Sequence, residues 1–60
     1  MSNNQPQAQH YEVRGADLQT VLTLDGYPCV YDYLAEAEDA ADMLDGWVAV
    51  LLTDGSYQYL

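Results

Sequence analysis

Sixty residues suffice for one small domain, and a chain of this length buries only about 60% of the surface that its unfolded form exposes. Half of the residues are hydrophobic, which is too many for a disordered chain. Ten acidic residues against one arginine and no lysine give a formal net charge of −9. This balance excludes direct binding to a nucleic-acid backbone or an anionic membrane. One histidine, one cysteine and one arginine also leave few ways to build a catalytic set.

The N-terminal segment, MSNNQPQAQ, is polar, uncharged and without a periodic pattern. We expect residues 1–9 to form a disordered tail and residues 10–60 to form a single domain. Cys29 is the only cysteine, so no internal disulfide can form, which is typical of a cytoplasmic protein. Its neighbours Pro28 and Val30 favour a packed thiol over a reactive one.

Two Asp-Gly dipeptides, at residues 25–26 and 54–55, each separate two runs of apolar and β-branched residues. Glycine tolerates the positive φ of a type I′ turn, so each dipeptide predicts a hairpin with a two-residue loop. The first hairpin would join 18–24 to 27–31, and the second would join 47–53 to 56–60. A short additional strand over 11–14 is also compatible with the pattern.

A two-residue second loop would place Leu52 opposite Tyr57 and Val50 opposite Tyr59. The other side of that strand would then carry a second apolar set: Trp47, Ala49 and Leu51. One short helix covers only one side of four strands, so this face calls for a partner or a second copy of the chain. The alternative is that the N-terminal segment folds over it.

Residues 33–44 are rich in Ala, Leu, Glu and Met and contain no turn residues, which predicts a helix. Asp32 would cap its start and Gly46 would end it. At 100° per residue, one stripe of this helix is apolar: Leu34, Ala37, Ala40, Ala41 and Leu44. The predicted fold is α+β, with a small antiparallel sheet of two hairpins in ββαββ order and one helix packed on a face.

Two ridges of carboxylates follow the remaining surface of the predicted helix. The first ridge is Asp32, Glu36 and Asp39, and the second ridge is Glu38, Asp42 and Asp45. Like charges at this spacing destabilise a helix, and no basic residue relieves them. Six carboxylates along roughly 20 Å of helix approach the charge spacing of one DNA strand. One interpretation is a nucleic-acid mimic that fills a basic groove, and the other is a solvated face kept for solubility.

Six tyrosines, one tryptophan and no phenylalanine are an unusual aromatic set that favours interfaces. We expect four tyrosines at a partner contact: Tyr31, Tyr33, Tyr57 and Tyr59. The alternative is that they pack as the core of a chain without phenylalanine. Asp39, Asp42 and Asp45 lack the order of a Ca²⁺-binding loop, so no metal site is predicted. No cofactor and no catalytic residue are predicted either.

In length, charge, element order and the carboxylates of residues 32–45, the chain resembles the small acidic inhibitors encoded by bacteriophages. These include anti-CRISPR proteins, anti-restriction proteins and uracil-DNA glycosylase inhibitors. The resemblance is one of class and involves no diagnostic motif. It implies a non-enzymatic inhibitor that binds the basic surface of a nucleic-acid-binding protein in the host cytoplasm. A small homodimeric interaction module, binding through an apolar and tyrosine-rich sheet face, is the alternative.

Overall fold

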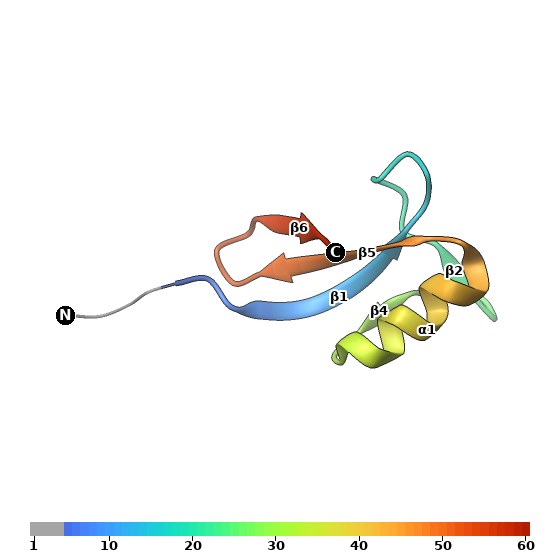
Figure 1. Ribbon diagram of the computed structural model, residues 1–60, viewed down its shortest axis with the longest axis horizontal. Helices are drawn as coiled ribbons and strands as arrows, with labels where there is room; N and C mark the ends of the chain where they lie inside the picture. The colour runs from blue at the N-terminus through green and yellow to red at the C-terminus, as the bar shows by residue number, and fades with distance from the viewer. Residues whose placement is uncertain (1–4) are drawn as a thin grey trace.

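The computed structural model describes residues 5–60, which form one helix and six strands (Figure 1). The strands before the helix are β1 (Ala8–Arg14), β2 (Thr23–Leu24), β3 (Tyr27–Pro28) and β4 (Val30–Tyr31). Helix α1 (Leu34–Leu44) is followed by β5 (Trp47–Leu52) and β6 (Tyr57–Tyr59). The main sheet is antiparallel in the order β4-β1-β5-β6, and β2 and β3 form a separate two-stranded sheet. The α+β class with an antiparallel sheet is confirmed.

The predicted ββαββ order is wrong, because the segment treated as a short additional strand is one of the two central strands of the sheet. Strand β1 pairs with β4 on one side and with β5 on the other. Its residues alternate between the two faces: Tyr11 and Val13 join the core beneath α1, whereas Glu12 and Arg14 lie on the other side. One face of this strand is therefore apolar and the other is charged.

The first Asp-Gly turn forms as predicted. Asp25 and Gly26 both have positive φ, of 53° and 84°, as a type I′ turn requires, and Leu24 pairs with Tyr27. The predicted strand over 18–24 is wrong in its first half, because Leu18 lies in a turn with φ 61°. The predicted strand over 27–31 is also divided, since its last part, β4, leaves the hairpin and pairs with β1.

The second Asp-Gly turn forms a three-residue loop, so the predicted register of this hairpin is wrong by one residue. The Leu52 N–H donates to Ser56 O at 2.8 Å, and the Gly55 N–H donates to Leu52 O at 3.0 Å. In this loop only Gly55 has positive φ, at 90°. Tyr57 therefore lies opposite Leu51 instead of Leu52. A one-residue shift moves every side chain of β6 to the other face, which places both C-terminal tyrosines on the side away from α1.

Helix α1 begins one residue later than predicted and has different caps. Tyr33 occupies the N-cap position without a side-chain hydrogen bond, so Asp32 is not the cap. At the other end Asp45 adopts the left-handed conformation with φ 55°, and the Gly46 N–H donates to Ala41 O at 2.9 Å. Gly46 is instead required by space, because an added Cβ would lie 2.5 Å from Cγ1 of Val13.

The predicted apolar stripe of α1 is confirmed as the helix side of the core. The buried cluster contains Val13, Cys29, Ala37, Ala40 and Val48. Leu34, Ala41 and Leu44 pack against it from the edges. Small alanines in the centre of the stripe let α1 approach the sheet closely, and Cys29 is fully buried as a packed thiol.

The expected tail overlaps the first strand. Ala8 and Gln9 belong to β1, and Gln7 exchanges two hydrogen bonds with Thr53, at 2.9 and 3.1 Å. The predicted boundary after residue 9 therefore lies too late in the chain. Residues 1–4 of that tail lie outside the described residues. Within residues 5–60, no helix has both the length and the apolar character needed to cross a membrane.

Candidate functional site

A groove of about 680 Å³ runs between one flank of α1 and the open end of the β5–β6 hairpin, where β5 begins and the chain ends. Its acidic lining is Glu38, Asp39, Asp42 and Asp45. The rest of the lining is Ala41, Gly46, Trp47, Val48 and Leu60. The groove therefore joins the whole second carboxylate ridge, and one residue of the first, to an apolar floor.

Helical geometry explains this division of the two predicted ridges. Glu38, Asp42 and Asp45 project within one narrow sector of the helix, on the flank that faces the groove. Asp32 precedes the helix and Glu36 lies in its first turn, and both are exposed outside the groove. Four of the six carboxylates thus line the groove, and the other two lie outside it.

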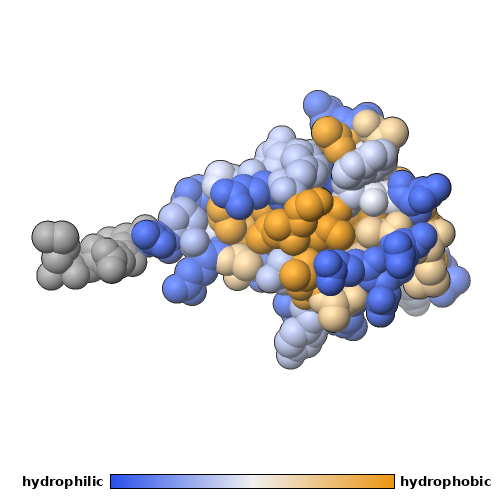
Figure 2. Space-filling view, in the orientation of Figure 1, coloured by the Kyte–Doolittle hydropathy of each residue, from blue (hydrophilic) through white to orange (hydrophobic). Residues whose placement is uncertain are grey.

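The floor of the groove depends on the observed register of β6. The Leu60 N–H donates to Val48 O at 3.0 Å, so Leu60 lies beside the buried Val48 on the helix side of the sheet. Helix α1 packs against β1, β4 and β5. Leu60 retains 63% of its accessible surface. Trp47 borders the groove at the edge of the sheet, and the register pairs it with Arg14, whose side chain lies on the face away from α1. Figure 2 shows hydrophobic surface beside the C-terminus, bordered by hydrophilic surface over α1.

No cation within residues 5–60 pairs with the groove carboxylates. Among residues 5–60 the ion pairs are Arg14 with Glu12, at 3.0 Å, and His10 with Glu12, at 3.3 Å when the imidazole is protonated. Both involve the opposite face of the sheet. The negative charge of the groove is therefore not neutralised within the described part of the chain, and it is available to an external cation.

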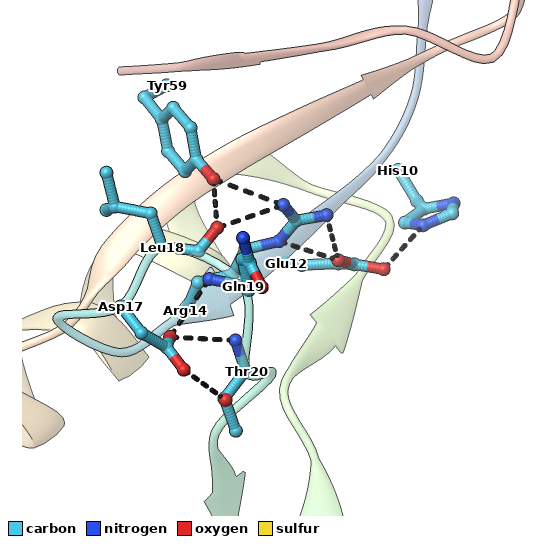
Figure 3. Close-up of polar contacts among 8 residues, drawn as sticks. All are labelled: His10, Glu12, Arg14, Asp17, Leu18, Gln19, Thr20 and Tyr59. Atoms are coloured by element: carbon cyan, nitrogen blue, oxygen red, sulfur yellow. Dashed lines mark hydrogen bonds and ion pairs between the residues drawn. The ribbon is translucent and has the colours of Figure 1, made fainter.

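The single arginine, Arg14, is bound by other residues of the chain on the sheet face away from α1 (Figure 3). Its Nε and Nη2 donate to Oε1 of Glu12 at 3.2 and 3.0 Å, and Nη1 donates to the Tyr59 hydroxyl at 3.2 Å and to Leu18 O at 3.3 Å. The guanidinium carbon lies 4.5 Å from the centroid of the Tyr57 ring. The Tyr59 hydroxyl also donates to Leu18 O. We call Glu12, Arg14, Tyr57 and Tyr59 the arginine cluster.

The arginine cluster covers part of the sheet face that was predicted to need a partner. Ala49 lies between Glu12 and Tyr59 in the strand register and is fully buried. The rings of Tyr57 and Tyr59 pack edge to face, with centroids 5.5 Å apart. Burial acts to lower the pKa of Arg14, but hydrogen bonds with Tyr59 and Glu12 raise it above its ordinary value. Arg14 therefore remains charged and bound within the molecule.

The four predicted contact tyrosines do not form one surface. Tyr31 pairs with Tyr11 in the sheet and packs against the core, whereas Tyr33 is exposed at the start of α1. A hydrogen bond with the Cys29 thiol, together with burial, raises the pKa of Tyr31. Tyr57 and Tyr59 belong to the arginine cluster. None of the four lines the acidic groove.

Two acids outside the helix are engaged in turns. Asp17 Oδ1 accepts the N–H groups of Gln19 and Thr20, both at 2.9 Å, and its other oxygen accepts the Thr20 hydroxyl (Figure 3). These bonds, that of the Thr20 hydroxyl foremost, lower the pKa of Asp17 to about 2. Asp54 accepts the hydroxyl and N–H of Ser56, which lower its pKa in the same way. These carboxylates shape loops.

The groove combines negative charge with apolar surface, an arrangement suited to binding. No group of three His, Cys, Asp or Glu side chains within residues 5–60 could hold a metal ion. The thiol of Cys29 is fully buried, and His10 contacts only Glu12 among the polar side chains described. The groove can attract a cation and cover its apolar part.

The sequence alone assigns no role to Arg14, the centre of the arginine cluster, or to Leu60, which lines the groove. The alternation of residues 10–14 indicates a strand with one charged face, and this pattern is the signal that places Arg14 beside Glu12. Leu60 could enter the groove only in the three-residue register, which the Asp-Gly dipeptide alone does not specify.

Comparison with known proteins identifies no relative: no family model, no curated protein and no solved structure matches the chain.

Proposed function

We propose that the protein is a small acidic inhibitor that binds the basic nucleic-acid-binding surface of another protein, such as a host defence nuclease complex. The observation that carries the proposal is the separation of charge in the fold. The only arginine is held by Glu12 and two tyrosines on one face, while six helix carboxylates stay exposed on and around α1. Folding thus leaves the negative surface free for a partner.

Such a surface would act by occupying the site of a phosphate backbone. Closely spaced carboxylates along α1 can pair with lysine and arginine side chains that otherwise contact phosphates. Long-range attraction between a strongly acidic chain and a basic channel accelerates their association, and salt weakens it. Inhibition would be stoichiometric, because binding involves no chemical step.

Affinity capture from a nuclease-treated bacterial lysate tests this function. We expect the immobilised protein to retain nucleic-acid-binding proteins, which rising salt or added duplex DNA then releases. Charge reversal at Glu36, Asp39 and Asp42 together should abolish this retention while circular dichroism shows an unchanged fold. A folded triple variant that retains the same proteins with the same yield would contradict the proposal.

A second candidate function is a homodimeric interaction module that uses the sheet face away from α1. The observation in its favour is the exposure of Val30, Trp47 and Tyr57, three large side chains outside the core. In this case the carboxylates would only keep the protein soluble. Sedimentation over a wide concentration range separates the two functions, because a monomer at every concentration excludes the homodimer.

A further inference from the structure

We propose that the outer edge of strand β6 is an interface between two copies of this chain, which pair their β6 strands side by side and antiparallel. In Figure 1, β6 is the outermost strand on its side of the main sheet. The contact would join two four-stranded sheets into one continuous sheet. This inference goes beyond both proposed functions, because it involves neither the helix carboxylates nor a face of the sheet.

The outer side of β6 carries unpaired backbone groups. Ser56 O and the Leu60 N–H bond to β5, at 2.8 and 3.0 Å. Backbone groups alternate in direction along a strand, so Gln58 is also turned towards β5, whereas the N–H and C=O groups of Tyr57 and Tyr59 point outwards. Within residues 5–60 these outward groups have no hydrogen-bond partner. Their spacing is the one that a further extended strand would match.

This edge has none of the features that usually prevent strand pairing. Proteins protect exposed edge strands with charged side chains, proline or bulges. Residues 55–60 contain no charge and no proline, in a chain with ten acidic residues, and β6 pairs with β5 without a register shift. The opposite edge is different, because β4 has two residues and leads at once into Asp32 and α1. A partner strand therefore fits β6 better than β4.

The arginine cluster holds the edge in an extended form. The guanidinium carbon of Arg14 lies 4.5 Å from the centroid of the Tyr57 ring, and the Tyr59 hydroxyl is bonded to Arg14 and to Leu18 O. Strand side chains stand roughly perpendicular to the sheet, so both rings leave the backbone edge open. An edge that is already ordered loses little conformational freedom when a second strand pairs with it.

A second copy of β6 is the occupant that matches this edge, because the strand is self-complementary. With Gln58 on a twofold axis, Tyr57 of each copy lies opposite Tyr59 of the other, and each such pair exchanges both backbone hydrogen bonds. This register uses every outward group of the strand. It also places an uncharged segment against an uncharged segment.

The net charge of −9 opposes this contact only weakly. Helix α1 packs against β1, β4 and β5, so both β6 strands would lie between the two helices. At about 4.8 Å per strand, the two β5 strands alone would be roughly 14 Å apart, which exceeds the Debye length of about 8 Å at physiological salt. Added salt should therefore strengthen the dimer. Salt weakens the binding of a basic partner, so the two contacts respond to salt in opposite directions.

Sedimentation of the intact chain from about 10 µM to about 1 mM tests the association. We expect a monomer–dimer equilibrium whose association constant rises about threefold or more between about 50 and 500 mM sodium chloride. A chain that stays monomeric at the highest concentration and salt would overturn the proposal. Such a result would leave the inhibitor function untouched, and loss of carboxylate-dependent lysate capture would leave the dimer untouched.

A cysteine on the twofold axis locates the contact. Cys29 is fully buried, so Gln58→Cys carries the only accessible thiol. Across the axis the two thiols belong to a non-hydrogen-bonded pair with about 4.5 Å between Cα atoms, which permits a disulfide. In the matched control Ser56→Cys, the two Cα atoms are roughly 14 Å apart along the strands. Mild oxidation should cross-link Gln58→Cys at least about tenfold faster. Equal rates would show that the copies meet elsewhere and would overturn the proposal.

N-methylation of the backbone tests the edge without changing a side chain. In a synthetic chain, a methyl group on the Tyr57 nitrogen replaces an outward N–H and leaves the bonds to β5 in place. The matched control is a methyl group on the nitrogen of Val30, which by the same alternation points outwards from β4, since Cys29 O accepts from β1. The first should weaken the dimer at least about tenfold and the second less than about twofold. Equal weakening, or none, in two folded chains would overturn the proposal.

Discussion

The charged side chains on the two sides of the main sheet differ in exposure and in pairing. On the face away from α1, Glu12 and Arg14 are mostly covered, with 14% and 12% of their side-chain surface exposed, and they neutralise each other. On the helix side, the carboxylates of α1 are exposed and have no cation among residues 5–60. Buried polar groups require partners, whereas exposed like charges cost only a few tenths of a kcal/mol per pair.

This difference separates structural charge from charge available for binding. A mostly covered carboxylate such as Glu12 must be paired for the chain to fold, so its contribution is to stability. The acids on α1 make the helix less stable on its own, and the packed alanine stripe offsets that cost. The groove carboxylates have no such structural role, so they are the candidates for a binding function.

The largest expected effect comes from breaking the arginine cluster. Arg14→Met keeps the aliphatic stem but takes the guanidinium away from Glu12, which then has only His10 beside it, and removes the contacts with Tyr57 and Tyr59. Leaving one partner of a mostly covered pair unsatisfied should lower the free energy of unfolding by about 3 kcal/mol. Urea denaturation followed by circular dichroism measures this loss. Glu12→Gln should cost less in the Arg14→Met background than alone, and full additivity would contradict the pairing.

A smaller loss is expected where α1 meets the sheet. In Gly46→Ala the new Cβ would lie 2.5 Å from Cγ1 of Val13 and 3.0 Å from the carbonyl oxygen of Arg14. Val13 is fully buried and stiff, so the helix must shift, at a cost of about 2 kcal/mol. Thermal unfolding measures it. Gly15→Ala is the matched control, because its nearest neighbour is a leucine methyl at 3.3 Å, and a similar loss in both variants would show that close packing at Gly46 is not the cause.

The sequence predicts the helix and one face of the core well, because both follow from local pattern. The stripe that contains Ala37 and Ala40 is set by the period of the helix, and the type I′ turn at Asp25-Gly26 is set by two adjacent residues. Neither requires knowledge of distant contacts. The carboxylate ridge at Glu38 and Asp42 was predictable for the same reason.

The groove itself could not be predicted, because it depends on strand order and register. The two Asp-Gly dipeptides are identical, yet the second is followed by Ser56, whose N–H and hydroxyl both bond to Asp54. That loop has three residues, and the extra residue brings Leu60 to the helix side and the tyrosines to Arg14. The central position of β1 likewise depends on pairing with strands far along the chain.

A modest gain in stability is expected when the groove loses charge. Glu38→Gln with Asp42→Asn removes a like-charge pair at i, i+4 and should raise the free energy of unfolding by a few tenths of a kcal/mol at low salt. The gain should shrink as sodium chloride is added, because salt screens the same repulsion in the unmodified protein. Paired urea denaturations at low and high salt measure both effects. A loss of stability would mean that the groove carboxylates have structural partners after all.

The smallest effect concerns the loop that supports the arginine cluster. Asp17 holds the turn that presents Leu18 O to Arg14 and Tyr59, and hydrogen bonds from Thr20 and Gln19 lower its folded pKa from 3.8 to about 2. Because the folded pKa is the lower one, this stabilisation is present above pH 3.8 and is lost as the pH falls from 3.8 towards about 2. Carboxyl chemical shifts in an NMR titration should therefore show Asp17 still ionised at pH 3. In Asp17→Asn the loss of stability over that interval should be smaller than in the unmodified protein. An Asp17 that titrates near 3.8 would mean that the turn is open in solution, and Arg14 would then lose the Leu18 carbonyl as an acceptor while it kept Glu12.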